Sequence, residues 1–474
     1  MPRAGARVTR PAARSSKQVR GKANPVEHAL RWLEEKGATQ VKIAGVDLDG
    51  VLRGKYVSLD KFSSCAKGGL GFCDVVFGWD LADELYDNAQ VTGWHTGYPD
   101  LQARIDLSTA RMIPWEPATA AFLLDFVMPD GSDYGPSPRA LLRRVGQRAR
   151  TMGFLPKFGS EYEFFIFRET PSSLRSKGFQ NLEPLDPGMF GYSWLRTSQS
   201  SDLVHALLDG CNAFGLEVEG FHTETGPGVY ETAIRYDLLE AAGDKSVLFK
   251  SAVKEICARH GLTACFMSKP SAKLPGCSGH VHQSLWTLDG ARNTFHDPRG
   301  EGSVSKTMRH YLGGQLKLMP ELTALYWPTI NSYKRSVENT WAPTSATWGR
   351  ENRTCALRVI GGTDAKAMRV EFRLLGADMN PYVGMAASLA AGLWGIENEV
   401  EPGEPLTGNA YRSDAAPLPR NLRDAITLLD RSSVARELLG EEFVDHYLRT
   451  RTWEVRQYER AVTTWELERY FELA

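Results

Sequence analysis

The pattern of apolar and polar residues predicts a small β-rich domain at residues 26–132. Residues 26–36 have the spacing of a helix. Two strand-like runs, Val41–Val46 and Val51–Val57, flank the turn sequence Asp47-Leu48-Asp49-Gly50 and predict a β-hairpin. More strands and loops are expected before the next helical pattern begins, and we therefore place a domain boundary near residue 132.

The larger domain predicted at residues 133–474 opens with a helix and then a strand at residues 157–167. This strand is rich in aromatic and β-branched residues. Both of its faces carry apolar side chains, as the central strand of a sheet requires. Residues 171–200 are polar and predict a loop, and the C-terminal part of the chain is mainly helical in pattern. Further helices or strands are predicted at residues 201–214, 216–223, 237–260, 263–267 and 279–286.

Two glutamates share one face of the strand at residues 157–167. Side chains alternate across a strand, so Glu161 and Glu163 point the same way, whereas Tyr162 and Phe164 line the opposite face. Two neighbouring carboxylates on a buried face repel each other, and burial disfavours their charged forms. A bound cation removes both problems. The pattern alone leaves two interpretations open: a strand end whose glutamates lie in water, or a cation site.

The composition is that of an ordinary globular protein, with 42% hydrophobic and 24% charged residues in a chain of 474. The formal net charge of −1 provides no overall field that would favour nucleic acid or a membrane surface. The longest apolar run, Val383–Ile396, is interrupted by glycines and is too short to cross a bilayer. We therefore expect neither a nucleic-acid partner nor a membrane partner.

The cysteines and the N-terminal sequence indicate in which cellular compartment the protein is expected. The chain has seven cysteines and no Cys-x-x-Cys sequence, which argues against a disulfide framework or a structural zinc site and for a reducing environment. The N-terminus lacks the apolar segment of a secretory signal, so we expect a cytoplasmic protein. Residues 1–25 carry only basic charges and predict a disordered tail, with a transit peptide or an anion-binding arm as alternatives.

Two further segments carry noteworthy polar residues, and one of them has two histidines that could bind a metal. His280 and His282 alternate on one face of the strand predicted at residues 279–286. A lone core histidine is usually only structural, but two on one face favour a ligand role more strongly. Glu224 and Glu231 stand at the two ends of a glycine-containing loop.

A third segment, residues 331–373, is dense in basic side chains. Interleaved apolar residues indicate buried strands and argue against a solvated or nucleic-acid-facing surface. Arg369, Glu371 and Arg373 alternate with apolar residues, so one face is charged. Arginines that converge with carboxylates suit a phosphorylated ligand that also bears a carboxylate. The other basic residues of the segment are Lys334, Arg335, Arg350, Arg353, Arg358 and Lys366.

Together these segments resemble the glutamine synthetase family over nearly everything after the tail. The motifs occur in the family's order and at its spacing, and the ordered set is far more specific than any one motif. They are Gly159-Ser160-Glu161-Tyr162-Glu163-Phe164, Glu224 to Glu231, Gly279-His280-Val281-His282-Gln283-Ser284-Leu285, Asn331-Ser332-Tyr333-Lys334-Arg335, Glu351-Asn352-Arg353, Arg369-Val370-Glu371-Phe372-Arg373 and Asn380-Pro381-Tyr382.

The resemblance implies an α+β fold, with an N-terminal β-grasp domain and a C-terminal catalytic domain built as a funnel of antiparallel strands with helices. It implies a homo-oligomer, usually a dodecamer of two hexameric rings with active sites between neighbouring subunits. It also implies a ligase that uses ATP with Mg²⁺ or Mn²⁺. The γ-carboxylate of glutamate attacks ATP to form γ-glutamyl phosphate, and an amine then displaces phosphate to give a γ-glutamyl amide.

Carried over residue by residue, the resemblance implies a role for each matching position. One divalent metal site would consist of Glu163, Glu224 and Glu231, and the other of Glu161, His280 and Glu371. Glutamate would be held by Arg335, Arg373 and Gly276. The nucleotide would contact Glu219, His282, Ser284, Lys366 and Arg369. The resemblance also implies that Arg353 and Arg358 lie near the transferred phosphate.

The sequence departs from the family where ammonium binds. Glutamine synthetases carry a glutamate directly before an Ala-Pro pair, and here that position is Trp341. The family's aspartate that also contacts ammonium lies in a stretch that is missing, with Asp74 and Asp80 as candidate replacements. An indole face can hold a cation or an alkyl or aryl group, which points to an amine larger than ammonia. Deprotonation of that amine would need another group, with Asp74, Asp80 and Glu338 as candidates.

Three functional interpretations follow. The first is an ATP-dependent ligase that joins glutamate to an organic amine such as a polyamine, ethanolamine, an alkylamine or an arylamine. The second is ordinary glutamine synthesis from ammonia, against which Trp341 argues. The third is a non-catalytic, ring-forming homologue, against which the complete set of metal-matching residues argues.

Overall fold

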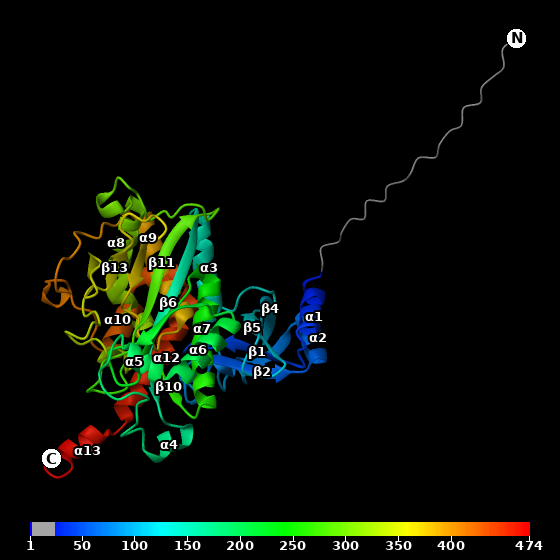
Figure 1. Cartoon of the computed structure of the whole chain (residues 1–474), viewed down its shortest axis with the longest axis horizontal. Helices are drawn as coiled ribbons and strands as arrows, with labels where there is room; N and C mark the ends of the chain where they lie inside the picture. Colours follow the sequence, from blue (N-terminus) through cyan, green and yellow to red (C-terminus); the bar gives the residue numbers. More distant parts are fainter. Residues whose placement is uncertain (2–23) are drawn as a thin grey trace.

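The structure is a computed structural model that describes Met1 and residues 24–474, so the tail predicted at residues 1–25 lies almost wholly outside the described residues. The chain forms two β-sheets, each with its own hydrophobic core, and helices pack against both (Figure 1). The α+β class is confirmed. The two sheets lie on either side of residue 132, and the domain boundary there stays a prediction.

The first sheet has five strands in the order β2-β1-β5-β4-β3. The predicted hairpin is β1 and β2, and β1 also pairs in parallel with β5. Helices α1 and α2 cover one face, where Phe62, Phe72 and Phe122 form a core, and the other face turns toward the larger part of the chain that contains the second sheet (Figure 1). The elements are α1 (Pro25–Glu35), β1 (Gln40–Val46), β2 (Leu52–Val57), α2 (Leu59–Gly68), β3 (Leu70–Cys73), β4 (Asp100–Met112) and β5 (Thr119–Val127).

The second sheet has nine strands, seven of them in the order β12-β13-β14-β11-β6-β8-β7, with β9 and β10 also pairing with β6. Within the described residues every pair is antiparallel except β12 with β13. The central strand predicted at residues 157–167 is therefore confirmed as β6. The strands are β6 (Phe154–Phe167), β7 (Val218–Thr223), β8 (Val229–Ile234), β9 (Asp237–Leu238), β10 (Thr263–Cys265), β11 (Gly279–Thr287), β12 (Trp348–Arg350), β13 (Leu357–Ile360) and β14 (Arg369–Phe372).

Helices cover the face of the second sheet that carries the even-numbered aromatic residues of β6. Tyr162 and Phe164 pack against Phe249 of α7 and against Phe266. The opposite face of β6 is thus left for Glu161 and Glu163. The helices are α3 (Pro138–Thr151), α4 (Pro171–Ser176), α5 (Trp194–Gln199), α6 (Ser201–Ala213), α7 (Leu239–Arg259), α8 (Lys306–Tyr326), α9 (Pro381–Glu397), α10 (Leu422–Arg431), α11 (Ser433–Leu439), α12 (Glu441–Arg460) and α13 (Thr464–Tyr470).

The loop predicted at residues 171–200 contains two short helices, α4 and α5, so this prediction was wrong in part. Helix α4 begins with a capping box, in which the hydroxyl of Thr170 accepts from the backbone of Ser173 and the hydroxyl of Ser173 accepts from the backbone of Thr170. Such caps stabilise a helix end through local hydrogen bonds. The polar composition hid this local order.

Two further expectations concern the whole chain. Among the described residues, no helix combines the length and the apolar character that a membrane crossing needs. The seven cysteines are free thiols in the structure.

Candidate active site

Charged side chains gather on one face of the second sheet because the strand register sets them opposite one another. In an antiparallel pair, directly opposed residues point to the same face. The opposed pairs run across six strands, from β7 to β13. They are His222 with Glu231, Glu231 with Glu163, Glu161 with His280, His282 with Glu371, and Glu371 with Arg358.

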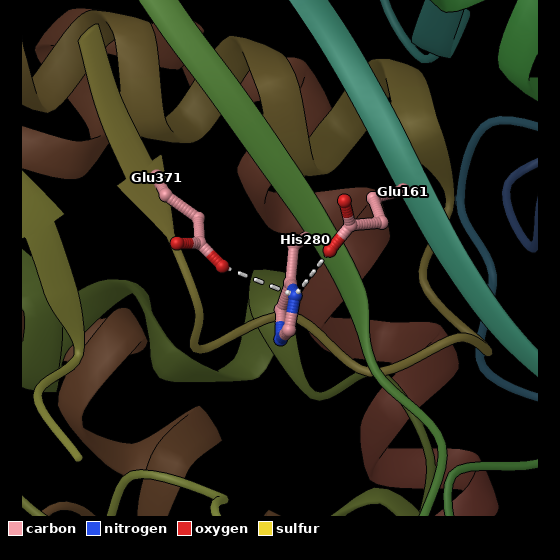
Figure 2. Close-up of side chains that lie close together, drawn as sticks. All are labelled: Glu161, His280 and Glu371. Carbon is pink, nitrogen blue, oxygen red and sulfur yellow. Dashed lines mark hydrogen bonds and ion pairs between the residues drawn. The ribbon is translucent and has the colours of Figure 1, made fainter. Parts of the chain in front are cut away.

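The first cluster consists of Glu161, His280 and Glu371, as the sequence predicts. Nδ1 of His280 lies 3.2 Å from Oε1 of Glu161 and 3.3 Å from Oε1 of Glu371, and Figure 2 shows the ring between the two carboxylates. One ligand atom from each residue falls within 4.8 Å of the others. Arg358 donates from Nη1 to Glu371 at 2.9 Å, and Arg373 also bonds Glu371. The group is therefore compact and mostly buried.

The second cluster consists of His222, Glu224 and Glu231, whose ligand atoms also fall within 4.8 Å of one another. Nε2 of His222 lies 3.0 Å from Oε1 of Glu231, and the ring of Tyr192 stacks on the imidazole at 4.3 Å. Glu163, the third member predicted for this site, lines the same cavity and accepts a hydrogen bond from the backbone of Ser278 at 2.8 Å.

His222 is the residue that the sequence reasoning missed. It lies in the strand predicted at residues 216–223, two residues before Glu224. The same alternation that singled out His280 and His282 applies to His222 and was available in the sequence. What the sequence did not contain was the pairing of β7 with β8, which sets His222 opposite Glu231.

The pKa values of the carboxylates are shifted in opposite directions in the two clusters. Burial raises the pKa of Glu231 to about 8, and the charges of Glu161 and Glu163 add to that increase. Burial also acts on Glu371, but Arg373, His280 and Arg358 outweigh it and lower the pKa of Glu371 to about 2. Burial alone would raise the pKa of Glu161, but the hydrogen bond with His280 and the nearby ring of His282 hold that pKa well below the usual range.

This donor set fits a hard divalent cation. Carboxylate oxygens with single imidazole nitrogens suit Mg²⁺ or Mn²⁺, and neither cluster contains a thiol. Burial and the repulsion from Glu161 and Glu163 raise the pKa of Glu231, and a cation between these carboxylates would offset both.

A cavity of about 1560 Å³ opens over this face of the sheet. It contains thirteen of the residues that the sequence singled out: Glu161, Glu163, Glu224, Glu231, Gly276, His280, His282, Trp341, Arg353, Arg358, Arg369, Glu371 and Arg373. Apolar residues, including Met189, Tyr192, Met267 and Trp341, line other parts of the wall. The cavity thus combines a strongly charged floor with partly aromatic sides.

Arg369 and His282, which both line the cavity, also contact each other. Nε of Arg369 donates to Nδ1 of His282 at 3.1 Å. This hydrogen bond leaves Nε2 of His282 on the side of Glu161, at 3.8 Å from its carboxylate.

Six predicted site residues do not line the cavity of the described chain: Arg335, Ser284, Glu219, Lys366, Glu338 and Asp74. Arg335 is only 4% exposed and lies directly behind Gly276. A Cβ atom placed on Gly276 would come within 2.7 Å of Cγ of Arg335. Glu219, Glu338 and Lys366 are exposed, and Glu338 lies between Val337 and Asn339, which do line the cavity. The roles of these six residues stay predictions.

Two of the remaining candidates, Ser284 and Asp80, make other contacts, and the third, Asp74, has a buried carboxylate oxygen without a partner among the described residues. The hydroxyl of Ser284 bonds the carbonyl of Lys157 and the indole of Trp286. Asp74 is buried in the N-terminal domain, and Asp80 accepts backbone hydrogen bonds from Ala82 and Glu84 in its own turn.

Trp341 presents its ring to the cavity. The residue is 61% exposed and lies in the left-handed backbone region, with φ of 62°. Hydrogen bonds fix the surrounding loop: the hydroxyl of Ser336 donates to the carbonyl of Pro343 at 2.9 Å, and that of Tyr411 donates to the carbonyl of Ala342 at 3.0 Å. The loop therefore holds an indole where a ligand in the cavity can reach it.

Comparison with known proteins gives the following. The family described as glutamine synthetase, catalytic domain, matches residues 136–470. Type-1 glutamine synthetase 2 of Dictyostelium discoideum is 50% identical over 438 residues, which cover 91% of this chain and 84% of that protein. Glutamate–isopropylamine ligase of Pseudomonas sp is 39% identical over 446 residues, covering 93% and 97%. Gamma-glutamylethanolamide synthetase of Streptomyces coelicolor is 38% identical over 433 residues, covering 91% and 92%.

Solved structures of GmaS, one without ligand and one with ADP, superpose on this chain with a TM-score of 0.82. They are 30% identical to it, and the match covers 94% of this chain and 99% of theirs.

Proposed function

Because the chain belongs to the glutamine synthetase family, we propose that it joins the γ-carboxylate of glutamate to an organic amine. ATP-dependent γ-glutamyl ligation is the general activity of this family, and the family includes ligases for amines as well as for ammonia. The proposal concerns the amine, and the observation that carries it is the indole of Trp341 on the cavity wall.

The two carboxylate clusters are proposed to hold two divalent cations. Glu161, His280 and Glu371 would bind one, and the second would be bound by Glu224 and Glu231 together with Glu163 or His222. When bound, such cations neutralise the phosphate oxygens of ATP. His222, which the sequence reasoning missed, enters the proposal either as a ligand or as the group that orients Glu231 through its 3.0 Å contact.

Arginines on the cavity wall are proposed to bind the anionic parts of the substrates. Arg373 would bind the carboxylate of glutamate, beside Gly276, and the buried Arg335 would support that wall from behind. Arg353 and Arg358 would stabilise the charge that develops on the transferred phosphoryl group. The nucleotide would lie near His282 and Arg369, with Glu219, Ser284 and Lys366 as further proposed contacts.

An arginine pair at Glu371 supports this arrangement. Arg358 and Arg373 both bond Glu371, and the Nε atom of each is buried without a partner among the described residues. A buried N–H that lacks an acceptor is costly. Both arginines line the cavity and are already held in position by Glu371, where they could bind an anionic substrate.

The proposed amine would pack its carbon chain against Trp341. An indole carries no charge that could stabilise ammonium in the way a carboxylate does, and it offers a large apolar surface instead. Two relatives whose names state an organic amine product or substrate support this choice. Glutamine synthesis from ammonia is the second candidate, and the 50% identical relative named a glutamine synthetase favours it.

The group that deprotonates the amine is also a proposal. Glu338 and Asp74 stay candidates, although neither lines the cavity of a single chain. We propose a homo-oligomer, a dodecamer of two hexameric rings, in which a neighbouring chain would supply such a group. A cytoplasmic location accords with the free cysteines.

The experiment is an ATP-dependent phosphate-release assay with glutamate, Mg²⁺ and a panel of amines that includes ammonia, with the products identified by mass spectrometry. The proposal expects a γ-glutamyl amide of at least one organic amine. Phosphate release with ammonia alone would favour glutamine synthesis, and no release with any amine would favour the non-catalytic interpretation.

A further inference from the structure

A second cavity, of about 220 Å³, lies between the N-terminal sheet and helix α7 of the catalytic domain. Strands β1, β2, β4 and β5 supply one side of it, and α7 together with the end of α6 supplies the other. Among the described residues it shares no lining residue with the cavity of the candidate active site. Most of its walls are apolar, with Ile113, Trp115, Leu123, Phe214 and Leu248 as the larger side chains.

One guanidinium group on this apolar wall is only partly hydrogen-bonded. Arg111 of β4 donates from Nε to the carbonyl of Thr109 at 3.1 Å, and its Cζ lies 5.5 Å from the centre of the Phe214 ring. Its Nη1 is buried and has no hydrogen-bond partner among the described residues. Burial lowers the pKa of Arg111, but a guanidinium stays charged at any ordinary pH. A buried positive charge without an acceptor is costly.

The carboxylate that acts on Arg111 electrostatically, Asp244, already has other partners. It accepts two hydrogen bonds from Arg139, each of 2.9 Å, and one from Tyr382 at 2.7 Å. Asp244 therefore leaves the donors of Arg111 free to bind something else.

The other charges at the cavity are also engaged. Glu255 accepts from the indole of Trp115 at 2.8 Å and lies 3.9 Å from Nζ of Lys42. Lys42 in turn donates to Glu116 at 2.8 Å. Arg111 is thus the cation of this cavity that lacks a carboxylate partner among the described residues, and Glu255 is an anion that would repel a second negative charge.

We propose that this cavity binds a small monocarboxylate with an apolar body, whose carboxylate binds the guanidinium of Arg111. The apolar walls would enclose the body of the ligand, and the guanidinium would bind its anionic end. At about 30 Å³ per water molecule, the volume corresponds to about seven waters, which suits a molecule of the size of benzoate. The site lies between two domains, so an occupant would contact both.

Benzoate is the probe, and benzamide of nearly the same shape is the neutral control. Binding to the full chain is measured by isothermal titration calorimetry, with saturating glutamate present to occupy the carboxylate-binding part of the active site. We expect about one benzoate per chain and at least about tenfold weaker binding of benzamide. Arg111→Met should weaken benzoate binding at least about tenfold. Arg104→Met is the matched control, because Arg104 lies on the same strand and its side chain is 58% exposed, and it should leave binding unchanged.

A second variant, Ala121→Leu, keeps Arg111 and fills part of the cavity. It should also weaken benzoate binding at least about tenfold, which separates loss of the site from a failure of Arg111→Met to fold. Equal binding of benzoate by the unmodified chain and by either cavity variant would overturn the proposal. Absence of benzoate binding to the unmodified chain would overturn it as well and would mean that water fills the cavity.

Discussion

Replacing Trp341 by alanine should weaken the use of an organic amine and leave the use of ammonia almost unchanged. A tryptophan side chain has roughly 250 Å² of surface. Since 61% of this residue is exposed to solvent, at most roughly 150 Å² can contact a ligand. A short carbon chain that covers about half of this area gains about 2 kcal/mol, at about 25 cal/mol per Å². This corresponds to about a thirtyfold decrease in kcat/KM when the indole is removed.

The assay is phosphate release at saturating ATP and glutamate, with kcat/KM determined for the best organic amine and for ammonia. Ammonia has no carbon to place against the ring, so its value should stay within about threefold. Trp94→Ala is the control, because Trp94 is 81% exposed and lies outside the cavity. An equal loss for both substrates would mean that Trp341 only supports its loop, and an unchanged value for the amine would refute the proposed contact.

Three other predictions concern the metal site and the stability of the fold. Glu161→Ala should abolish phosphate release without changing the circular dichroism spectrum, and near-normal turnover at moderate Mg²⁺ would contradict the metal assignment. Arg139→Met removes the partner of Asp244, Asp125 and Asp106, and should lower the free energy of unfolding by about 3 kcal/mol in denaturant titrations; no loss would refute a stabilising network. Burial lowers the pKa of His446 from 6.5 to about 4, so the unfolded chain binds a proton first and stability should fall by roughly 3 kcal/mol as pH falls from 6.5 to 4. His446→Leu should remove most of that loss, and an unchanged pH profile would contradict it.

The strand period in the sequence was sufficient to predict the chemistry of the central strand. Alternation set Glu161 and Glu163 on one face and Tyr162 and Phe164 on the other, and the structure confirms both the strand and the separation of these residues. The same rule set His280 and His282 together on β11. The family and the α+β fold, which rest on the ordered motifs, are confirmed too.

The sequence could not predict which distant strands pair or in what register. That pairing sets His222 opposite Glu231, and it also decides that Arg335 lies behind Gly276 and not on the cavity surface. Asp74 and Glu338 are not among the residues that line the cavity, and this too depends on the three-dimensional arrangement of the chain. Sequence order says nothing about which group reaches the site in space, or from which chain it comes.

The most direct test of the central proposal is the ratio of kcat/KM for the best organic amine to kcat/KM for ammonia, in the unmodified protein and in Trp341→Glu. The proposal predicts a ratio well above one in the unmodified protein. It predicts a large decrease in Trp341→Glu, because a carboxylate at this position stabilises ammonium and removes the apolar surface. A preference of the unmodified protein for ammonia over every amine tested would contradict the proposal and leave glutamine synthesis in its place.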